Sequence, residues 1–451
     1  MAIFSSLAGF FKRHKRKILV TSAVTISIYF AINEFVIKKF QTYQKQLRQE
    51  LIFKQQIKQR FIQTQQDCYY TILALLPVLT SPIVEYLPIE LITQALRLKK
   101  NNNDKPTGDN SLTTDNLSLL ENNNDPESKL SFYMNKSKVE LWNLLKIKTI
   151  TRMLTLMYSI SGLFLITKLQ LNILARRAYL ESAILMAGVK ATNNDIDPHE
   201  NYIIEQSYLS LSWWLLNKGW SNLNSIIEAL VVKKFEKINP KSELTVGEFD
   251  SILQEIIIEI NTNNKEFILA NIFPINYPDL LETMLNTNPD LMHYLDTPDS
   301  NLIKLINETN SIMLDNGYVF DLLNTLILTN LNTLSQNLST GLGEASGSLL
   351  LSSANLQDSQ RLVEIPNKPY KLASFLAQLS VQNGTIMDNN NIKYDEKEED
   401  DDDIQGFIDK LNVTTFPSSE NSEFSGNAYV NKMNELQDLD DFSAGIYSNF
   451  E

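Results

Sequence analysis

The chain has 451 residues, a net charge of −13 and one cysteine, Cys68. A single cysteine excludes a disulfide within the chain, and the low content of Gly and Pro, 14 of each, with abundant Leu, Ile, Lys, Glu and Gln favours helices over sheets. Residues 1–60 carry twelve Lys and Arg against two Glu while the remainder is acidic, which favours contact of the basic end with an anionic membrane surface and argues against nucleic-acid binding.

The amino-terminal segment pairs a basic cluster with an apolar stretch. Residues 18–37, "ILVTSAVTISIYFAINEFVI", would span about 30 Å as a helix, the thickness of the hydrocarbon core of a bilayer. No small-residue cleavage site follows, as a secretory signal requires, and the stretch is apolar rather than amphipathic, unlike a mitochondrial presequence. We therefore predict a basic segment at 1–17 and a retained transmembrane anchor at 18–37. The positive-inside rule places the large domain in a lumen, but basic residues on the other flank leave the orientation open.

A long helix is predicted in the middle of the chain. Residues 129–192 contain no Pro, and apolar residues recur at steps of three and four between Ile147 and Leu174. The stretch 153–167 is apolar on every side, but its fifteen residues cover only about 22 Å and are too short for a second membrane span. We expect this helix to be buried on all faces by its neighbours.

The remaining segments read as shorter helices and polar loops. Helical patterns occupy 40–76, 87–98, 201–218, 221–236, 247–260, 278–285, 300–314, 317–336, 370–381 and 427–440. Polar composition predicts disordered loops near 101–128, 383–403 and 412–426. Together these features predict an all-α protein: an elongated helical bundle around one long central helix, occupying 40–451 and following a single N-terminal transmembrane anchor.

Signatures of catalysis or metal binding are absent from the sequence. It contains no HExxH, GxSxG or GxxxxGK[ST] motif, and its three histidines lie far apart. Cys68 has no histidine nearby and reads as a buried structural thiol, while the acidic run 395–403 reads as solvated. We therefore expect a protein that is not an enzyme, holds no metal and needs no cofactor.

Trp142, in "KVELWNLLKIKTITR", is the residue on which a binding function would depend. A helix places Lys138, Trp142 and Leu145 on one face, whereas the apolar stripe from Ile147 to Leu154 faces elsewhere. The pattern leaves two readings open for Trp142, a core residue or a surface anchor for a partner. Three other tryptophans lie among leucines and are expected in the core, namely Trp213, Trp214 and Trp220.

Several stretches resemble the peroxin-3 family of yeast type, also called peroxisomal biogenesis factor 3. They are the basic cluster and anchor, "FKQQIKQRFIQTQQDCYYTILALLPVL", the segment that begins "KVELWNLLKIKTITR", and "YLSLSWWLLNKGW", so the resemblance covers most of residues 12–380. It implies a peroxisomal membrane protein, inserted directly or by way of the endoplasmic reticulum, with a large cytosolic helical domain. That domain would dock the soluble receptor-chaperone peroxin-19, which delivers new peroxisomal membrane proteins, and would recruit factors for peroxisome inheritance and for selective autophagy of peroxisomes (pexophagy).

The resemblance also implies roles for particular residues. Trp142 matches the family's receptor-binding tryptophan, with Leu145 and Lys138 beside it in the peroxin-19 groove. The family's targeting element, which acts with the anchor on peroxisomal membrane lipid, matches Lys12, Arg13, Lys15, Arg16 and Lys17. A helical organelle-contact tether without a receptor role is the alternative of a different class.

Overall fold

The computed structural model describes residues 38–103, 126–186, 198–297, 300–314, 317–343, 368–387 and 427–449. The chain divides into two compact units, Met1–Gln65 and Gln66–Glu451. The basic cluster, the anchor at 18–37 and the acidic run lie outside the described residues, as do 104–125, 388–403 and 412–426 of the predicted loops.

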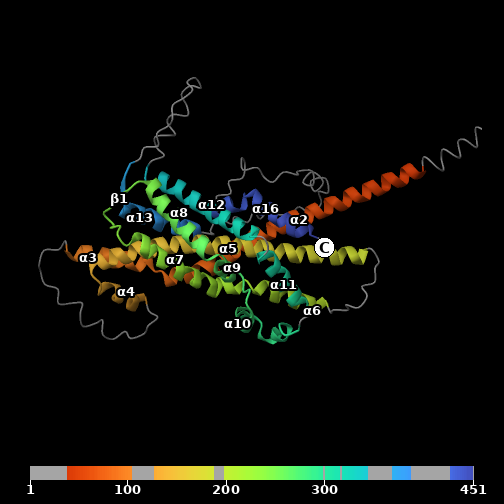
Figure 1. Ribbon diagram of the computed structural model, residues 1–451, viewed down its shortest axis with the longest axis horizontal. Helices are drawn as coiled ribbons and strands as arrows, with labels where there is room; N and C mark the ends of the chain where they lie inside the picture. The colour runs from red at the N-terminus through yellow and green to blue at the C-terminus, as the bar shows by residue number, and fades with distance from the viewer. Residues whose placement is uncertain are drawn as a thin grey trace, which may run out of the picture. The chain divides into compact units, whose positions relative to one another are not determined.

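Helix α5, Lys138–Met186, forms the centre of the second unit. Helices α3 (Ile89–Asn103), α7 (Trp220–Phe235), α12 (Tyr318–Gly341), α13 (Leu372–Met387) and α16 (Gln437–Ser448) all pack against it (Figure 1). Every residue from 151 to 170 is buried, so the apolar stretch lies inside the protein on all sides. Two helical segments of the described part of the chain, Lys54–Tyr86 and Lys138–Ile184, are long and apolar enough to cross a membrane. The most apolar window of Lys138–Ile184 is completely buried inside the protein, which identifies this segment as a core helix. The predicted buried central helix is confirmed.

The described residues are almost entirely helical, which confirms the all-α class. Besides the helices above, the helices are α2 (Lys38–Tyr86), α4 (Pro126–Met134), α6 (Pro198–Ser210), α8 (Val246–Asn263), α9 (Lys265–Ile272), α10 (Tyr277–Thr287), α11 (Asn301–Leu314) and α15 (Ala428–Asn434), with a π-helix at Leu215–Gly219 and a 3₁₀-helix at Pro289–Tyr294. The strands seen in this part of the chain are β1 (Glu243–Leu244) and β2 (Tyr370–Lys371), which pair antiparallel.

Several predicted boundaries differ from the structure. Helix α2 continues past residue 76 through Pro77 and Pro82, because its inner face buries Leu79 and Ile83 in the core and this burial outweighs the missing amide hydrogen bonds. The single helix predicted at 427–440 is wrong: α15 and α16 are separate, and the Asn427 side chain caps the first of them. Helix α9 was not predicted, since it is short and follows Asn-rich sequence that favours loops, and α4 was not predicted as a helix separate from α5.

Basic side chains on α5 hold other helices in place from inside the core. Lys146 Nζ donates to the carbonyl oxygens of Phe235 at 2.7 Å and Ile238 at 2.8 Å, the last residue of α7 and a residue just beyond it, where the helix leaves carbonyls without a partner in a next turn. Arg176 donates to the carbonyl of Ile446 on α16 and forms an ion pair with Glu308 on α11. Buried charges cost free energy unless they are paired, so these contacts fix where the surrounding helices sit.

Candidate partner-binding surface

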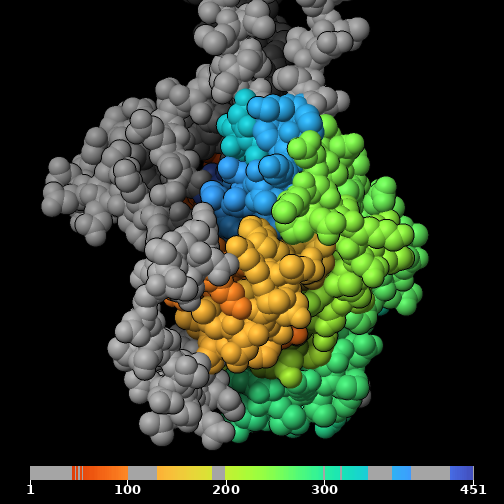
Figure 2. Space-filling model, turned by 90° about the vertical axis from the view of Figure 1, so that its left-hand side faces the viewer, coloured from red at the N-terminus to blue at the C-terminus, as the bar shows by residue number. Residues whose placement is uncertain are grey.

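A small apolar cluster, separate from the main core, joins α3, α4 and the start of α5. Its buried members are Ile89, Ile92, Ala95 and Leu96 of α3 with Leu141 and Leu145 of α5, and its half-buried members are Leu130, Tyr133, Met134, Trp142 and Leu144. We call it the α3–α4–α5 cluster. Figure 2 shows the face where α4 and the first part of α5, both orange-yellow, reach the surface beside α13 in blue.

Local hydrogen bonds fix where α5 begins. The Ser137 amide donates to Glu140 Oε2 at 2.8 Å and the Glu140 amide donates to Ser137 Oγ at 3.2 Å, which is a capping box. Hydrogen bonds from the Ser137 amide and from the Ser137 side chain to the Glu140 carboxyl lower the pKa of that carboxyl. The Lys99 ammonium of α3 donates to the carbonyl of Lys136 in the α4–α5 turn. The first two turns of α5, which carry Lys138 and Trp142, therefore start from a defined position.

The three residues expected at the partner site take different positions. Trp142 is half-buried and packs on the α3–α4–α5 cluster, and Lys138 is exposed. Leu145 is 7% exposed and belongs to the buried part of the cluster. The structure thus brings Trp142 and Leu145 together, with Leu145 as support beneath the surface. Ile150 and Leu154 lie in the main core, as their phase along the helix predicted.

The other tryptophans are largely internal. Trp214 and Trp220 are buried, and the Trp214 indole donates to the carbonyl of Ala270 at 2.9 Å, which confirms the core prediction for these two. Trp213 is half-buried.

Three exposed apolar side chains from the same helices were missed by sequence reasoning. They are Leu98 of α3, Phe132 of α4 and Val139 of α5, which are 39%, 58% and 71% exposed. Val139 lies three residues before Trp142, so a helix puts both on one side, and this spacing could have identified it. Phe132 could not be found in the same way, because α4 begins at Pro126, inside the loop predicted at 101–128, and was not foreseen as a helix of its own. Val139 thus adds exposed apolar area on the side of α5 that carries Trp142.

Basic residues outnumber acidic ones on the elements that carry this surface. Among the described side chains of α3, α4, the turn between α4 and α5 and the first turn of α5, four are basic (Arg97, Lys99, Lys136, Lys138) and two are acidic (Glu90, Glu140). The Lys136 ammonium lies 4.5 Å from the centre of the Phe132 ring, a cation–π contact. An apolar surface with a basic rim suits an amphipathic helix whose polar face is acidic.

Potential metal ligands and the one cysteine are the remaining groups of chemical interest in the described part of the chain. No group of three or more His, Cys, Asp or Glu there could hold a metal ion. Cys68 is fully buried, and burial raises its thiol pKa to about 12. The thiol therefore stays protonated and unreactive at neutral pH.

Comparison with known proteins agrees with the resemblance seen in the sequence. The family model described as Peroxin-3 matches residues 9–449. The Debaryomyces hansenii protein "Peroxisomal biogenesis factor 3" is 51% identical over the whole of both chains. The Komagataella phaffii protein "Peroxisomal membrane protein PEX3" is 31% identical and covers 98% of this chain and 99% of its own, and the mouse "Peroxisomal biogenesis factor 3" is 25% identical over 74% and 78%. The chain therefore belongs to the Peroxin-3 family, whose members are biogenesis factors of the peroxisomal membrane.

Proposed function

We propose that this protein is the docking receptor for peroxin-19 at the peroxisomal membrane, and that the surface around Trp142 binds the amphipathic amino-terminal helix of peroxin-19. Membership of the family supports a role in peroxisome biogenesis and in the insertion of membrane proteins. The observation that carries the docking proposal is the half-buried Trp142, which packs on the same cluster of helices that exposes Phe132 of α4 and Val139 of α5.

The α3–α4–α5 cluster suits recognition of a helix. Leu145 and Leu141 support Trp142 from below, so the indole is held in place before a partner arrives. A partner helix that places apolar side chains at positions i, i+3 and i+7 would cover Trp142 and Val139 together. An indole buried in this way commonly contributes about 2–4 kcal/mol to an interface.

The basic rim gives the proposed site its selectivity. Lys136 and Lys138 are close to the exposed apolar side chains in sequence and would meet acidic residues on the partner helix. Rim charges act mainly on the association rate, and salt screens them. The Lys138 side chain would therefore speed up encounter, while Trp142 would slow down dissociation.

Anchoring and orientation complete the proposed receptor. Residues 18–37 would form a single membrane span, and Lys12, Arg13, Lys15, Arg16 and Lys17 would direct it to the peroxisome; both segments lie outside the described residues. The large domain would face the cytosol, where peroxin-19 is soluble. There it would also recruit inheritance and pexophagy factors.

Titration of the full chain in lipid nanodiscs with peroxin-19 tests the receptor role. Receptor function predicts saturable binding that Lys138→Ser weakens by about 3-fold at low salt and less at high salt. Lys304→Ser is the matched control, because that exposed lysine lies on α11, which meets α5 at Arg176, far along the helix from Lys138. An organelle-contact tether without a receptor role predicts no peroxin-19 binding to the unaltered chain.

A further inference from the structure

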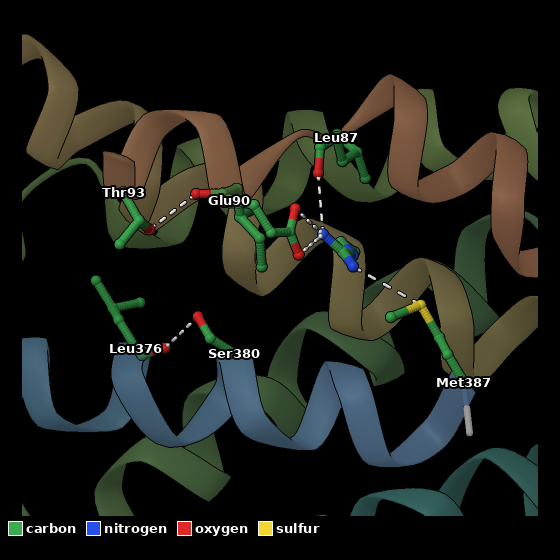
Figure 3. Close-up of polar contacts among 8 residues, drawn as sticks. Leu87, Glu90, Thr93, Leu376, Ser380 and Met387 are labelled. Atoms are coloured by element: carbon green, nitrogen blue, oxygen red, sulfur yellow. Dashed lines mark hydrogen bonds and ion pairs between the residues drawn. The ribbon is translucent and has the colours of Figure 1, made fainter. Parts of the chain in front are cut away.

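A buried arginine ties α5 to the first turn of α3. Arg152 Nη1 donates to both carboxylate oxygens of Glu90, at 2.8 and 2.9 Å, and to the carbonyl of Leu87 at 3.3 Å (Figure 3). Its other terminal nitrogen, Nη2, lies 3.7 Å from the Met387 sulfur at the end of α13. The Arg152 side chain is 1% exposed, whereas that of Glu90 is 62% exposed.

These contacts act at the corner that sets the direction of α3. Helix α2 ends at Tyr86 and α3 begins at Ile89, so only Leu87 and Pro88 connect them. Arg152 holds one residue of this connection, Leu87, and one residue of the first turn of α3, Glu90. A shift of the guanidinium would therefore change where α3 starts.

The other end of α3 is tied to the beginning of α5. Lys99 donates to the carbonyl of Lys136, just before α5 begins, while Glu90 meets Arg152 two heptads further along. Helix α3 thus runs antiparallel to α5 between two polar contacts. The α3–α4–α5 cluster lies between them, and Ile92 and Leu96 of α3 form part of its floor with Leu145.

We propose that Arg152 and Glu90 are a positioning pair for the partner-binding surface, which holds α3 so that Ile92 and Leu96 support Trp142. This inference rests on the proposed docking function. A pair of one buried and one mostly exposed charge is a poor source of stability, because burial of the guanidinium offsets most of the attraction. Its effect is instead geometric, since a guanidinium accepts few arrangements of its partners.

The test replaces the pair while sparing the fold. The double variant Arg152→Met, Glu90→Gln removes both charges and keeps similar side-chain volumes, which buried pairs often tolerate. The matched control is Lys148→Met, Glu228→Gln, which removes the 2.7 Å ion pair between α5 and α7 about one turn away. Each full chain, in nanodiscs, is titrated with the peroxin-19 amino-terminal peptide, melted, and followed by hydrogen exchange of the α3 amides.

The positioning role predicts a split between stability and binding. The double variant should melt within a few degrees of the unaltered chain, bind the peptide about 10-fold more weakly, and exchange the amides of Ile89–Leu96 faster. The control should change none of these. Glu90→Asp keeps the charge on a shorter side chain, so it should weaken peptide binding and speed up α3 amide exchange to a smaller extent. It replaces the double variant in the test if that variant fails to fold.

Two results would overturn the proposal in distinguishable ways. If Trp142→Ala abolishes peptide binding while the double variant and Glu90→Asp both bind and exchange like the unaltered chain, the pair has no positioning role and the docking function stands. If the unaltered chain does not bind the peptide, the docking function fails and this proposal fails with it.

Discussion

Trp142 and Leu145 lie one turn apart on α5 but have different surroundings. Leu145 is enclosed by α3, whereas Trp142 keeps part of its ring on the surface. Helical spacing predicted that the two share a face, and the structure agrees. The spacing could not predict that Leu145 is buried. The residues that cover it, Ile92 and Leu96, belong to α3, which is separated from α5 in the sequence by α4 and by the stretch 104–125, and no local pattern shows that these two helices pack together.

Cys68 provides a prediction at the same scale. Burial raises its pKa from 9.0 to about 12, so at neutral pH the reactive thiolate is about 1000-fold rarer than for an ordinary thiol. Iodoacetamide should label the native full chain at a rate set by transient opening, and the rate should rise to that of a free thiol in denaturant. Because the chain has one cysteine, mass spectrometry reads the result directly. Labelling of the native protein as fast as free cysteine would show that this site is open.

At the scale of elements, helix boundaries were predicted best where nearby residues cap the helix. The helix predicted at 247–260 is α8, which begins at Val246 behind a capping box of Thr245 and Glu248. The sequence predicted one helix over 201–218, but in the structure α6 stops at Ser210 and a π-helix follows at Leu215–Gly219. The π-helix lies where Gly219 meets α9, a contact between distant segments that no local pattern encodes.

Gly219 is predicted to be intolerant of any side chain. Its φ of −57° is helical, so its role is steric rather than conformational. An added Cβ would lie 1.8 Å from the carbonyl oxygen of Asn271. Gly219→Ala should therefore lower the free energy of unfolding by about 3 kcal/mol, as measured by thermal melting.

Gly384 supplies the control for this substitution. It lies inside α13, and a Cβ there would meet nothing within 4 Å. Gly384→Ala should raise stability by about 0.5–1 kcal/mol, because alanine is the better helix former. Equal effects of the two substitutions would refute the close approach of α9 to Gly219.

At the scale of the whole molecule, the two ends of the chain differ in charge. The basic amino-terminal end suits the membrane surface, whereas the remainder of the chain is acidic but includes the basic residues around Trp142. The all-α class followed from composition, and the family from several motifs. Orientation did not follow from the positive-inside rule, because basic residues flank the apolar stretch on both sides.

Protease protection tests the proposed cytosolic orientation. Protease added to intact peroxisomes should digest the unit Gln66–Glu451 while a matrix enzyme inside the organelle stays intact. Protection of this unit until detergent is added would place it in the lumen and would contradict docking of a cytosolic receptor.

The central claim is that Trp142 anchors peroxin-19, and one paired measurement tests it. The full chain in nanodiscs is titrated with the peroxin-19 amino-terminal peptide and melted, for Trp142→Ala and for Leu145→Ala. We predict that Trp142→Ala lowers affinity about 30- to 1000-fold, the equivalent of about 2–4 kcal/mol. Its effect on melting should be smaller than that of Leu145→Ala, which removes a buried leucine and should cost about 2–5 kcal/mol of stability. Unchanged peptide affinity in a well-folded Trp142→Ala protein would contradict the account.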